Sequence, residues 1–212
     1  NPLAPYYRRA PMPVDLAAVF ADPELPLHLD IGCARGRFLL RMAKTDPRWN
    51  YLGVEIREPL VIEANRLAEE AGLVNLHYSF CNAMLWLEPL LQGVPQGLLQ
   101  MVTIQFPDPW FKKKHAKRRM VNQELIDTIA RQLAGDGRVF VQTDIEFLSE
   151  EMFELFRSDR RFGQVSAAES PFSVTTEREN AVEEKGLPIY RAIFKPIEQA
   201  VNLLAHAGDL TA

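Results

Sequence analysis

The chain has 212 residues, 47% of them hydrophobic, which is enough to bury the core of one medium-sized domain. Its formal net charge is −4, and such a mildly acidic composition excludes a protein that binds nucleic acid indiscriminately over its whole surface. The sequence shows no apolar run of membrane-spanning length and no signal-peptide pattern, so we expect a cytoplasmic protein without membrane contact.

Residues 1–25 contain several prolines and no helix or strand period, and we interpret them as an N-terminal arm. From Pro26 onward, β-rich runs alternate with helical patterns. Strands are predicted at 26–32, 50–56, 73–81, 98–106, 137–144, 163–169 and 188–194. Helices are predicted at 35–45 and 57–71, from 82 onward, from 121 to a terminator at Gly135, and around 147–156. This alternation predicts an α/β, doubly wound, Rossmann-like fold, a mostly parallel seven-stranded sheet with helices on both faces.

The end of the chain is less regular. The polar segment 170–186 is longer than a typical connection, and such loops are usually functional or disordered. A helical stretch from 197 to about 206 has no feature that indicates a role. We therefore expect a single domain at 26–196 followed by a C-terminal helix or tail at 197–212.

Two cysteines, Cys33 and Cys81, lack C-x-x-C spacing, and the four histidines are scattered. No disulfide framework and no metal site are predicted from them. We expect both cysteines to be small packing residues.

The turn after the first predicted strand reads DIGCARG, with Gly32 and Gly36 framing the small Ala34. A dinucleotide-binding G-x-G-x-x-G would require glycine at positions 34 and 37, where Ala34 and Arg37 stand. G-x-A-x-G is instead close to the first motif of methyltransferases that use S-adenosylmethionine. The alternative is a helix-entry turn that binds nothing.

Three polar residues end the first three predicted strands, where ligands of open α/β sheets bind. Glu55 can accept hydrogen bonds from both hydroxyls of an adenosyl ribose, and Asp30 suits the cationic amino end of the methionine part. Each acid has the alternative of a surface acid or a helix cap. Asn82 can bond an adenine edge or cap the helix that begins with NAMLWL, and the sequence favours neither.

The segment FPDPWFKKKHAKRR, residues 106–119, gathers six cations directly behind Asp108 in an acidic protein. Charge runs are usually solvated helix faces, but this one follows the end of a predicted strand. We therefore predict a contact with the backbone of an RNA. Trp110 either stacks on a base or plugs the loop, and we favour the plug.

With its later motifs, the sequence resembles the tRNA (guanine-N7-)-methyltransferase family, which methylates guanosine 46 in the variable loop. The resemblance rests on Asp108-Pro109-Trp110 with the following lysines, on Thr143-Asp144, and on Thr176 to Glu179 before the G-x-P-I-Y-R run at 186–191. It covers roughly residues 25–195. Departures are Phe111 for the usual proline, Lys114 for arginine, Asp30 for glutamate and Ala34 for glycine.

The resemblance implies a class I methyltransferase fold, S-adenosylmethionine as cofactor and tRNA as substrate. It gives the leading catalytic role to Asp108, which is also placed beside the cofactor. The expected cofactor-binding residues are Asp30, Gly32, Gly36, Glu55, Asn82 and Asp108. The expected contacts with the substrate nucleoside are Lys112, Asp144, Thr176, Glu177, Arg178 and Glu179, and those with the tRNA backbone are Lys113, Lys114, Lys117, Arg118 and Arg119.

Two other functions remain open on the sequence. One is a catalytically inactive tRNA-binding partner with the same fold, and the other is a methyltransferase that acts on a small molecule or a protein. The sequence does not decide between a monomer and a homodimer.

Overall fold

A computed structural model describes residues 2–165 and 169–197. Within these ranges, seven strands form one sheet in the order β3-β2-β1-β4-β5-β7-β6. All neighbouring pairs are parallel except the two made by β7. The strands are β1 (Leu27–Ile31), β2 (Asn50–Glu55), β3 (Leu76–Phe80), β4 (Leu99–Gln105), β5 (Leu133–Thr143), β6 (Phe162–Val165) and β7 (Tyr190–Pro196). The predicted seven-stranded, mostly parallel sheet is confirmed.

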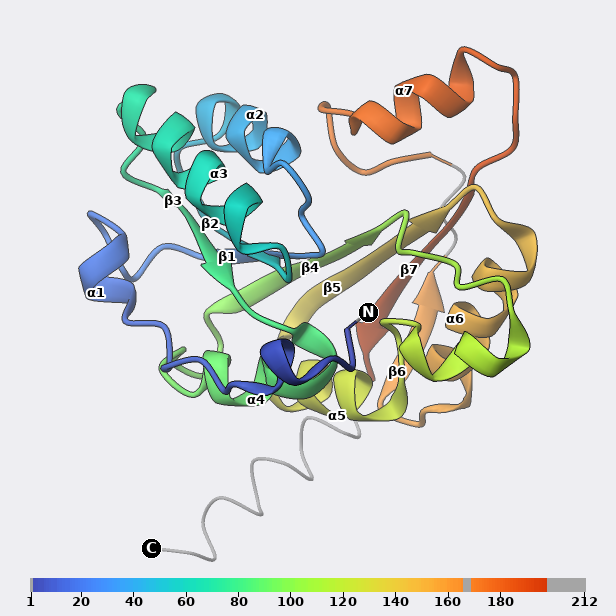
Figure 1. The fold of residues 1–212 in the computed structure, drawn as a ribbon. Helices are drawn as coiled ribbons and strands as arrows, with labels where there is room; N and C mark the ends of the chain where they lie inside the picture. Colours follow the sequence, from blue (N-terminus) through green and yellow to red (C-terminus); the bar gives the residue numbers. More distant parts are fainter. Residues whose placement is uncertain (1, 166–168, 198–212) are drawn as a thin grey trace, which may run out of the picture.

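Helices cover both faces of this sheet, as Figure 1 shows. One core lies under α2 and α3, and a second, larger core lies under α4, α5 and α6. The strands β1 and β2 between them are buried along their whole length, and β4 along most of it, as expected for parallel strands covered on both faces. The helices are α1 (Leu16–Val19), α2 (Arg37–Thr45), α3 (Glu58–Glu70), α4 (Ala83–Leu91), α5 (Gln123–Gln132), α6 (Glu146–Ser158) and α7 (Glu177–Glu183), with 3-10 turns η1 (Pro5–Arg8) and η2 (Lys113–Arg118).

Residues 2–25 differ from the arm without helices that the sequence predicted. They contain η1 and α1, and the side chain of Asp15 caps α1 by accepting from the amides of the first turn. Leu16 and Phe20 are buried in the larger core. A four-residue helix is too short to show a helical period, so sequence patterning cannot find it.

The helix after the basic segment ends earlier than predicted. Gly135 does not close it, because α5 stops at Gln132 and β5 begins at Leu133, which pairs with Leu99 of β4. Pairing with β4 supplies hydrogen-bond partners for the backbone N–H and C=O groups that a longer helix would have paired internally.

The long polar segment predicted at 170–186 contains α7, which the sequence analysis did not predict. The predicted strand 163–169 ends at Val165 in β6, and residues 166–168 lie outside the described part. The helix predicted from 197 to 206 also lies outside it, apart from Ile197.

Candidate functional site

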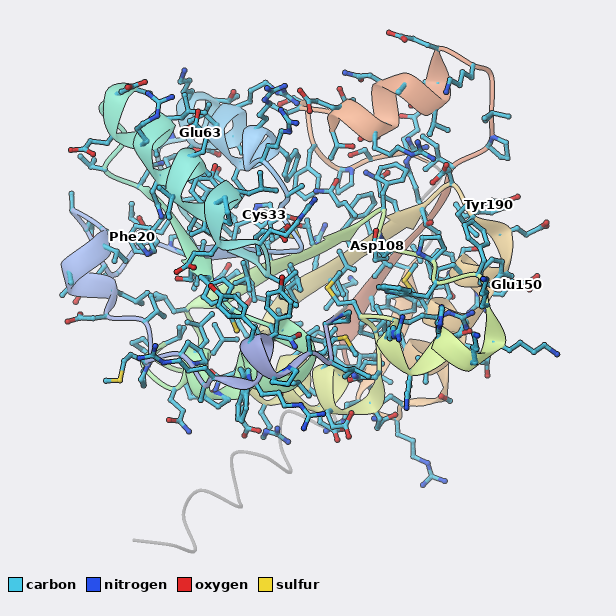
Figure 2. The ribbon with its side chains drawn as sticks, viewed as in Figure 1. Phe20, Cys33, Glu63, Asp108, Glu150 and Tyr190 are labelled. Carbon is cyan, nitrogen blue, oxygen red and sulfur yellow. The ribbon has the colours of Figure 1, made fainter. Side chains whose placement is uncertain are left out.

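A cavity of about 900 Å³ opens at the carboxyl ends of β1, β2, β4 and β5. It lies where the strand order reverses, between β1 and β4, which is the usual ligand position in open α/β sheets. Figure 2 shows Cys33, in the turn after β1, and Asp108, in the loop after β4, between α3 and α6. The lining includes most of the predicted cofactor and substrate residues: Asp30, Gly32, Glu55, Asn82, Asp108, Asp144, Thr176, Glu177 and Arg178.

The turn after β1 has a left-handed backbone at three positions, with φ of 80° at Gly32, 50° at Ala34 and 70° at Gly36. Gly36 also lies against a buried ring, since a Cβ there would come within 2.5 Å of Tyr78. The Tyr78 hydroxyl donates to the Gly36 carbonyl at 2.5 Å. Only glycine fits this approach, so the turn is pinned at the start of α2. Gly36 itself is not among the lining residues.

Glu55 ends β2 and is buried. Its Oε2 accepts from the Ala34 amide at 3.0 Å, and both of its oxygens accept from the Arg57 guanidinium at 3.0 and 3.2 Å. The guanidinium therefore holds the carboxylate that a ribose would use. The Arg57 side chain is 58% exposed and can turn into solvent, but Glu55 is 4% exposed, so ribose hydroxyls would have to replace the lost hydrogen bonds.

Asp30 is buried at the end of β1, and its Oδ1 accepts from the Thr103 hydroxyl at 2.6 Å and from Gln105 at 3.4 Å. Burial raises the pKa of Asp30 to about 6, although both hydrogen bonds oppose that shift. The carboxyl group is thus poised to ionise near neutral pH, and a cationic ligand group would favour its charged form.

Asn82 precedes α4, but its side chain does not cap that helix. Its amide nitrogen instead donates to the Pro2 carbonyl at 2.8 Å. Pro2 and Tyr7 line the cavity as well, so the N-terminal segment covers its end at β3. The contact with an adenine edge stays a prediction.

Asp108 sits exposed at the cavity rim, in a loop with two non-glycine residues in the left-handed region. These are Phe106, with φ of 50°, and Trp110, with φ of 44°. Each such residue costs on the order of 1 kcal/mol, so the loop persists only because its surroundings hold it. The Phe106 amide donates to the Gln142 carbonyl at 2.8 Å, which ties the start of the loop to β5.

The basic segment divides into two groups. The exposed cations project from η2 and the residue before it: Lys112, Lys113, Lys114 and Lys117. Arg118 lies over the Trp110 ring at 5.0 Å, and its Nε is buried without a hydrogen-bond partner among the described residues. Trp110 also contacts His115 edge to face at 5.8 Å and lines the cavity, so the plug and the base-stacking interpretations both stay predictions.

Arg119 differs from its predicted role as a free backbone-binding cation. Its side chain is 11% exposed, donates to the Pro109 carbonyl at 3.0 Å and pairs with Glu151 of α6. It holds the loop to α6 and has little surface left for a phosphate.

Charged contacts hold α7 above the cavity. Glu177 pairs with Arg37 of α2, and Arg178 pairs with Asp144 at the end of β5. Arg41 donates to the Thr175 carbonyl at 2.5 Å. The predicted substrate residues Asp144, Glu177 and Arg178 are therefore brought together at one rim, but they are paired with cations or acids of the chain.

The sequence analysis expected Glu179 to contact the substrate nucleoside, but its carboxylate is not free to accept at this rim. It is 1% exposed, does not line the cavity, and forms a capping box with Thr176 at the start of α7. Its carboxylate also accepts from Arg191 at 2.9 Å and from Gln142 at 3.2 Å. In this structure its contacts are with the protein itself.

The family model described as "Putative methyltransferase" matches residues 24–192. A tRNA (guanine-N(7)-)-methyltransferase of Trichormus variabilis is 53% identical over 201 residues, covering 93% of this chain and 94% of the relative. The Microcystis aeruginosa protein of the same name is 47% identical over 199 residues, covering 92% and 94%.

The chain belongs to the tRNA (guanine-N7-)-methyltransferase family.

Two solved structures share the fold of this family member. The aminoglycoside resistance methyltransferase NpmB1 gives a TM-score of 0.56 at 17% identity, covering 86% of this chain and 90% of that one. An rRNA methylase from Streptococcus thermophilus gives 0.54 at 12% identity, covering 86% and 92%. At such identities the likeness confirms the predicted fold class and no more.

The sequence analysis did not assign a role to several residues that hold the site of this tRNA (guanine-N7-)-methyltransferase family member together. Arg37 and Arg57 hold acids of the site, and Gln142 and Arg191 hold Glu179. Arg37 and Arg57 stood inside predicted helices, where a single sequence gives no reason to select them, and Arg191 was noted only as part of the 186–191 motif, without a role. Among residues 2–165 and 169–197, no group of three or more His, Cys, Asp or Glu side chains could bind a metal ion.

Proposed function

We propose that this chain transfers a methyl group from S-adenosylmethionine to N7 of a guanosine in tRNA, at position 46 of the variable loop. The observation that carries the proposal is the placement of Asp108. It stands on a strained loop at the rim of a cavity with a glycine turn and two buried acids, beside exposed lysines. The name of the relatives supports the same reaction.

The residues of the cavity fit S-adenosylmethionine. The left-handed turn at Gly32 brings backbone close to the ligand space, and Asp30 offers a carboxylate for the amino group. Glu55 would accept from the ribose once Arg57 turns outward, and Asn82, which also lines the cavity, would bind the adenine. The volume is ample for a ligand of this size. When bound, the cofactor supplies the methyl group on a sulfonium.

Asp108 acts on the guanine in this proposal. Guanine N7 carries a free lone pair, so no base has to remove a proton, and the task of the protein is positioning and electrostatics. The purine gains positive charge as the methyl group arrives, and a carboxylate next to it stabilises that charge. The two left-handed residues that flank Asp108 hold it in place before the substrate arrives.

The exposed lysines bind the tRNA backbone. Lys113, Lys114 and Lys117 are exposed in the turn that follows the Asp108 loop, while the chain as a whole carries a formal charge of −4. Lys112, the predicted nucleoside contact, is exposed as well but is not among the residues that line the cavity. A local basic patch on an acidic protein favours a backbone that approaches this edge and weakens contact elsewhere. Arg118, stacked on Trp110, lies between this patch and the cavity.

The proposed compartment is the cytoplasm, where unmodified tRNA is available. No helix in the described part of the chain is long and apolar enough to cross a membrane. Monomer and homodimer both remain compatible with the proposal.

The test is nucleoside mass spectrometry on unmodified tRNA incubated with the protein and S-adenosylmethionine. A matched transcript carries adenosine in place of guanosine 46. We expect 7-methylguanosine in the first transcript alone. Product in both transcripts would mean that a guanosine other than 46 is methylated. Absence of product, with cofactor binding demonstrated, would favour the inactive tRNA-binding partner. Methylation that needs no RNA would favour a small molecule or protein substrate.

A further inference from the structure

Asp30 is the junction of two buried polar chains that the proposed chemistry does not use. Its Oδ1 accepts hydrogen bonds from the side chains of Thr103 and Gln105, both on β4. Thr103 pairs with Asp30 across β1 and β4 and is fully buried. Thr103 does not line the cavity, whereas the half-buried Gln105 does, and each continues to a further side chain of the protein.

The first chain runs from Thr103 to His28 on β1. The imidazole Nε2 lies 3.1 Å from Thr103 Oγ1. Because the hydroxyl has one proton and gives it to ionised Asp30, Nε2 must carry a proton and donate it to Thr103. Burial lowers the pKa of His28 to about 3, so the ring is neutral. It stacks on Phe172, with ring centroids 5.4 Å apart and planes 19° apart.

The second chain runs from Gln105 to Gln142 on β5. Gln142 Nε2 donates to Gln105 Oε1 at 2.8 Å and to Glu179 Oε2 at 3.2 Å. Its Oε1 accepts from Arg191 at 3.1 Å. Both amide protons and the amide oxygen are thus engaged, which fixes the orientation of a side chain with no exposed surface.

Both chains end on one segment, residues 169–183. Phe172 lies near its start and Glu179 inside α7, and the segment carries Thr176, Glu177 and Arg178 at the cavity rim. In Figure 1, α7 stands on the side of α2, apart from the body of the sheet. The rings of Phe38 and Phe140 and the ion pairs of Glu177 and Arg178 hold this segment, and the two polar chains add contacts with Phe172 and Glu179.

We propose that Thr103 and Gln142 are positioning residues that couple Asp30, on the cofactor side, to the segment 169–183, on the substrate side. The inference rests on the proposed function, which assigns the amino end of the cofactor to Asp30. A neutral Asp30 can accept both hydrogen bonds at Oδ1, but the ionised carboxylate accepts them more strongly. A cationic amino group favours that state, and so favours the arrangement that holds Phe172 and Glu179. By linkage, displacement of the segment weakens cofactor binding by the same factor.

Several titratable groups lie close enough to Asp30 to influence its charge state. The titratable groups that face it are Glu55 at the end of β2, Cys33 in the following turn and Tyr78 on β3. Tyr51 stands beside His28, with ring centroids 5.5 Å apart. Burial raises the pKa of Tyr51, Tyr78 and Cys33, and it raises that of Asp30 to about 6.

The first measurement is the affinity for S-adenosylhomocysteine, which keeps the amino group, by calorimetry across the pKa of Asp30. We expect the unaltered protein to lose affinity as the pH falls through about 6. Thr103→Val removes the hydroxyl at nearly constant size and should move that loss upward by about one pH unit, since a hydrogen bond to a charged group disappears. Thr103→Ser should restore the original profile. Thr128→Val, which removes a buried hydroxyl on α5, is the matched control and should change nothing.

The second measurement is hydrogen exchange. Saturating S-adenosylhomocysteine should slow amide exchange across residues 177–183 in the unaltered protein. Gln142→Met, which keeps side-chain length without hydrogen bonds, should abolish that slowing. An unchanged pH profile in Thr103→Val, or a Thr103→Ser variant as impaired as the valine variant, would overturn the coupling. So would exchange that does not respond to the ligand. If the unaltered protein binds no S-adenosylhomocysteine, the proposed function is refuted, and the coupling, which rests on it, is refuted as well.

Discussion

Replacing Glu179 separates a structural role from a role in reading guanine. In Glu179→Ala, Arg191 loses its fully buried partner and keeps Glu183 at 3.2 Å, while Gln142 loses an acceptor and α7 loses its capping box. Breaking a buried ion pair costs about 3–5 kcal/mol, and the remaining contact with Glu183 places this case near the lower limit. Thr176 still accepts from the backbone amide of residue 179, so the lost half of the capping box adds less than about 1 kcal/mol. We expect a decrease of about 3–4 kcal/mol in the free energy of unfolding.

Urea denaturation followed by circular dichroism measures this decrease. Glu183→Ala is the matched control, because Glu183 binds the same guanidinium but its side chain is 52% exposed. An exposed pair of this kind contributes less than about 1 kcal/mol. If Glu179→Ala keeps its stability within about 1 kcal/mol while methylation is lost, the structural reasoning is refuted and the carboxylate acts on the substrate.

Asp108→Asn should keep affinity for S-adenosylhomocysteine and for tRNA but reduce turnover sharply, because the amide cannot stabilise the cationic purine; single-turnover methylation that proceeds normally would contradict this role. Lys113→Ala with Lys114→Ala should weaken tRNA binding and lower the slope of log K against log salt by between one and two, as expected for about two lost phosphate contacts. Filter binding over a salt series measures that slope, and an unchanged slope would place the RNA elsewhere. Acid should destabilise the protein through Asp159, since the Arg161 guanidinium lowers its pKa from 3.8 to about 2. This stabilisation is present above the unfolded value and is lost as the pH falls through about 2, and Asp159→Asn should flatten that part of a denaturation curve measured against pH.

Much of the fold could be predicted because short β-rich runs alternate with helical patterns, and because the run that forms β4 is largely apolar. The turn at Gly32 was visible in the sequence, because a left-handed backbone limits the residues allowed there. Helix α7 was missed although Thr176 and Glu179 are spaced as a capping box, since the same residues had been assigned to the substrate.

The limits of the site prediction follow from tertiary contacts. Arg119 belongs to a run of cations, and only the fold shows that it packs against Phe147 and pairs with Glu151. Glu55 was correctly placed at the cavity, whereas its contact with Arg57 depends on which way one flexible side chain turns. Local sequence gives the type and position of a polar residue, but its partner is decided by strands that are distant in sequence.

The position of β7 has a consequence for synthesis of the chain on the ribosome. Residues 190–196 come late in the sequence, yet β7 lies inside the sheet between β5 and β6. Until these residues emerge from the ribosome, one edge of β5 is unpaired and can pair with a wrong strand. Glu179 also lacks its ion pair with Arg191 during this time. The nascent protein therefore assembles its cofactor turn early and its substrate rim last, so the site is completed only when the last strand is inserted.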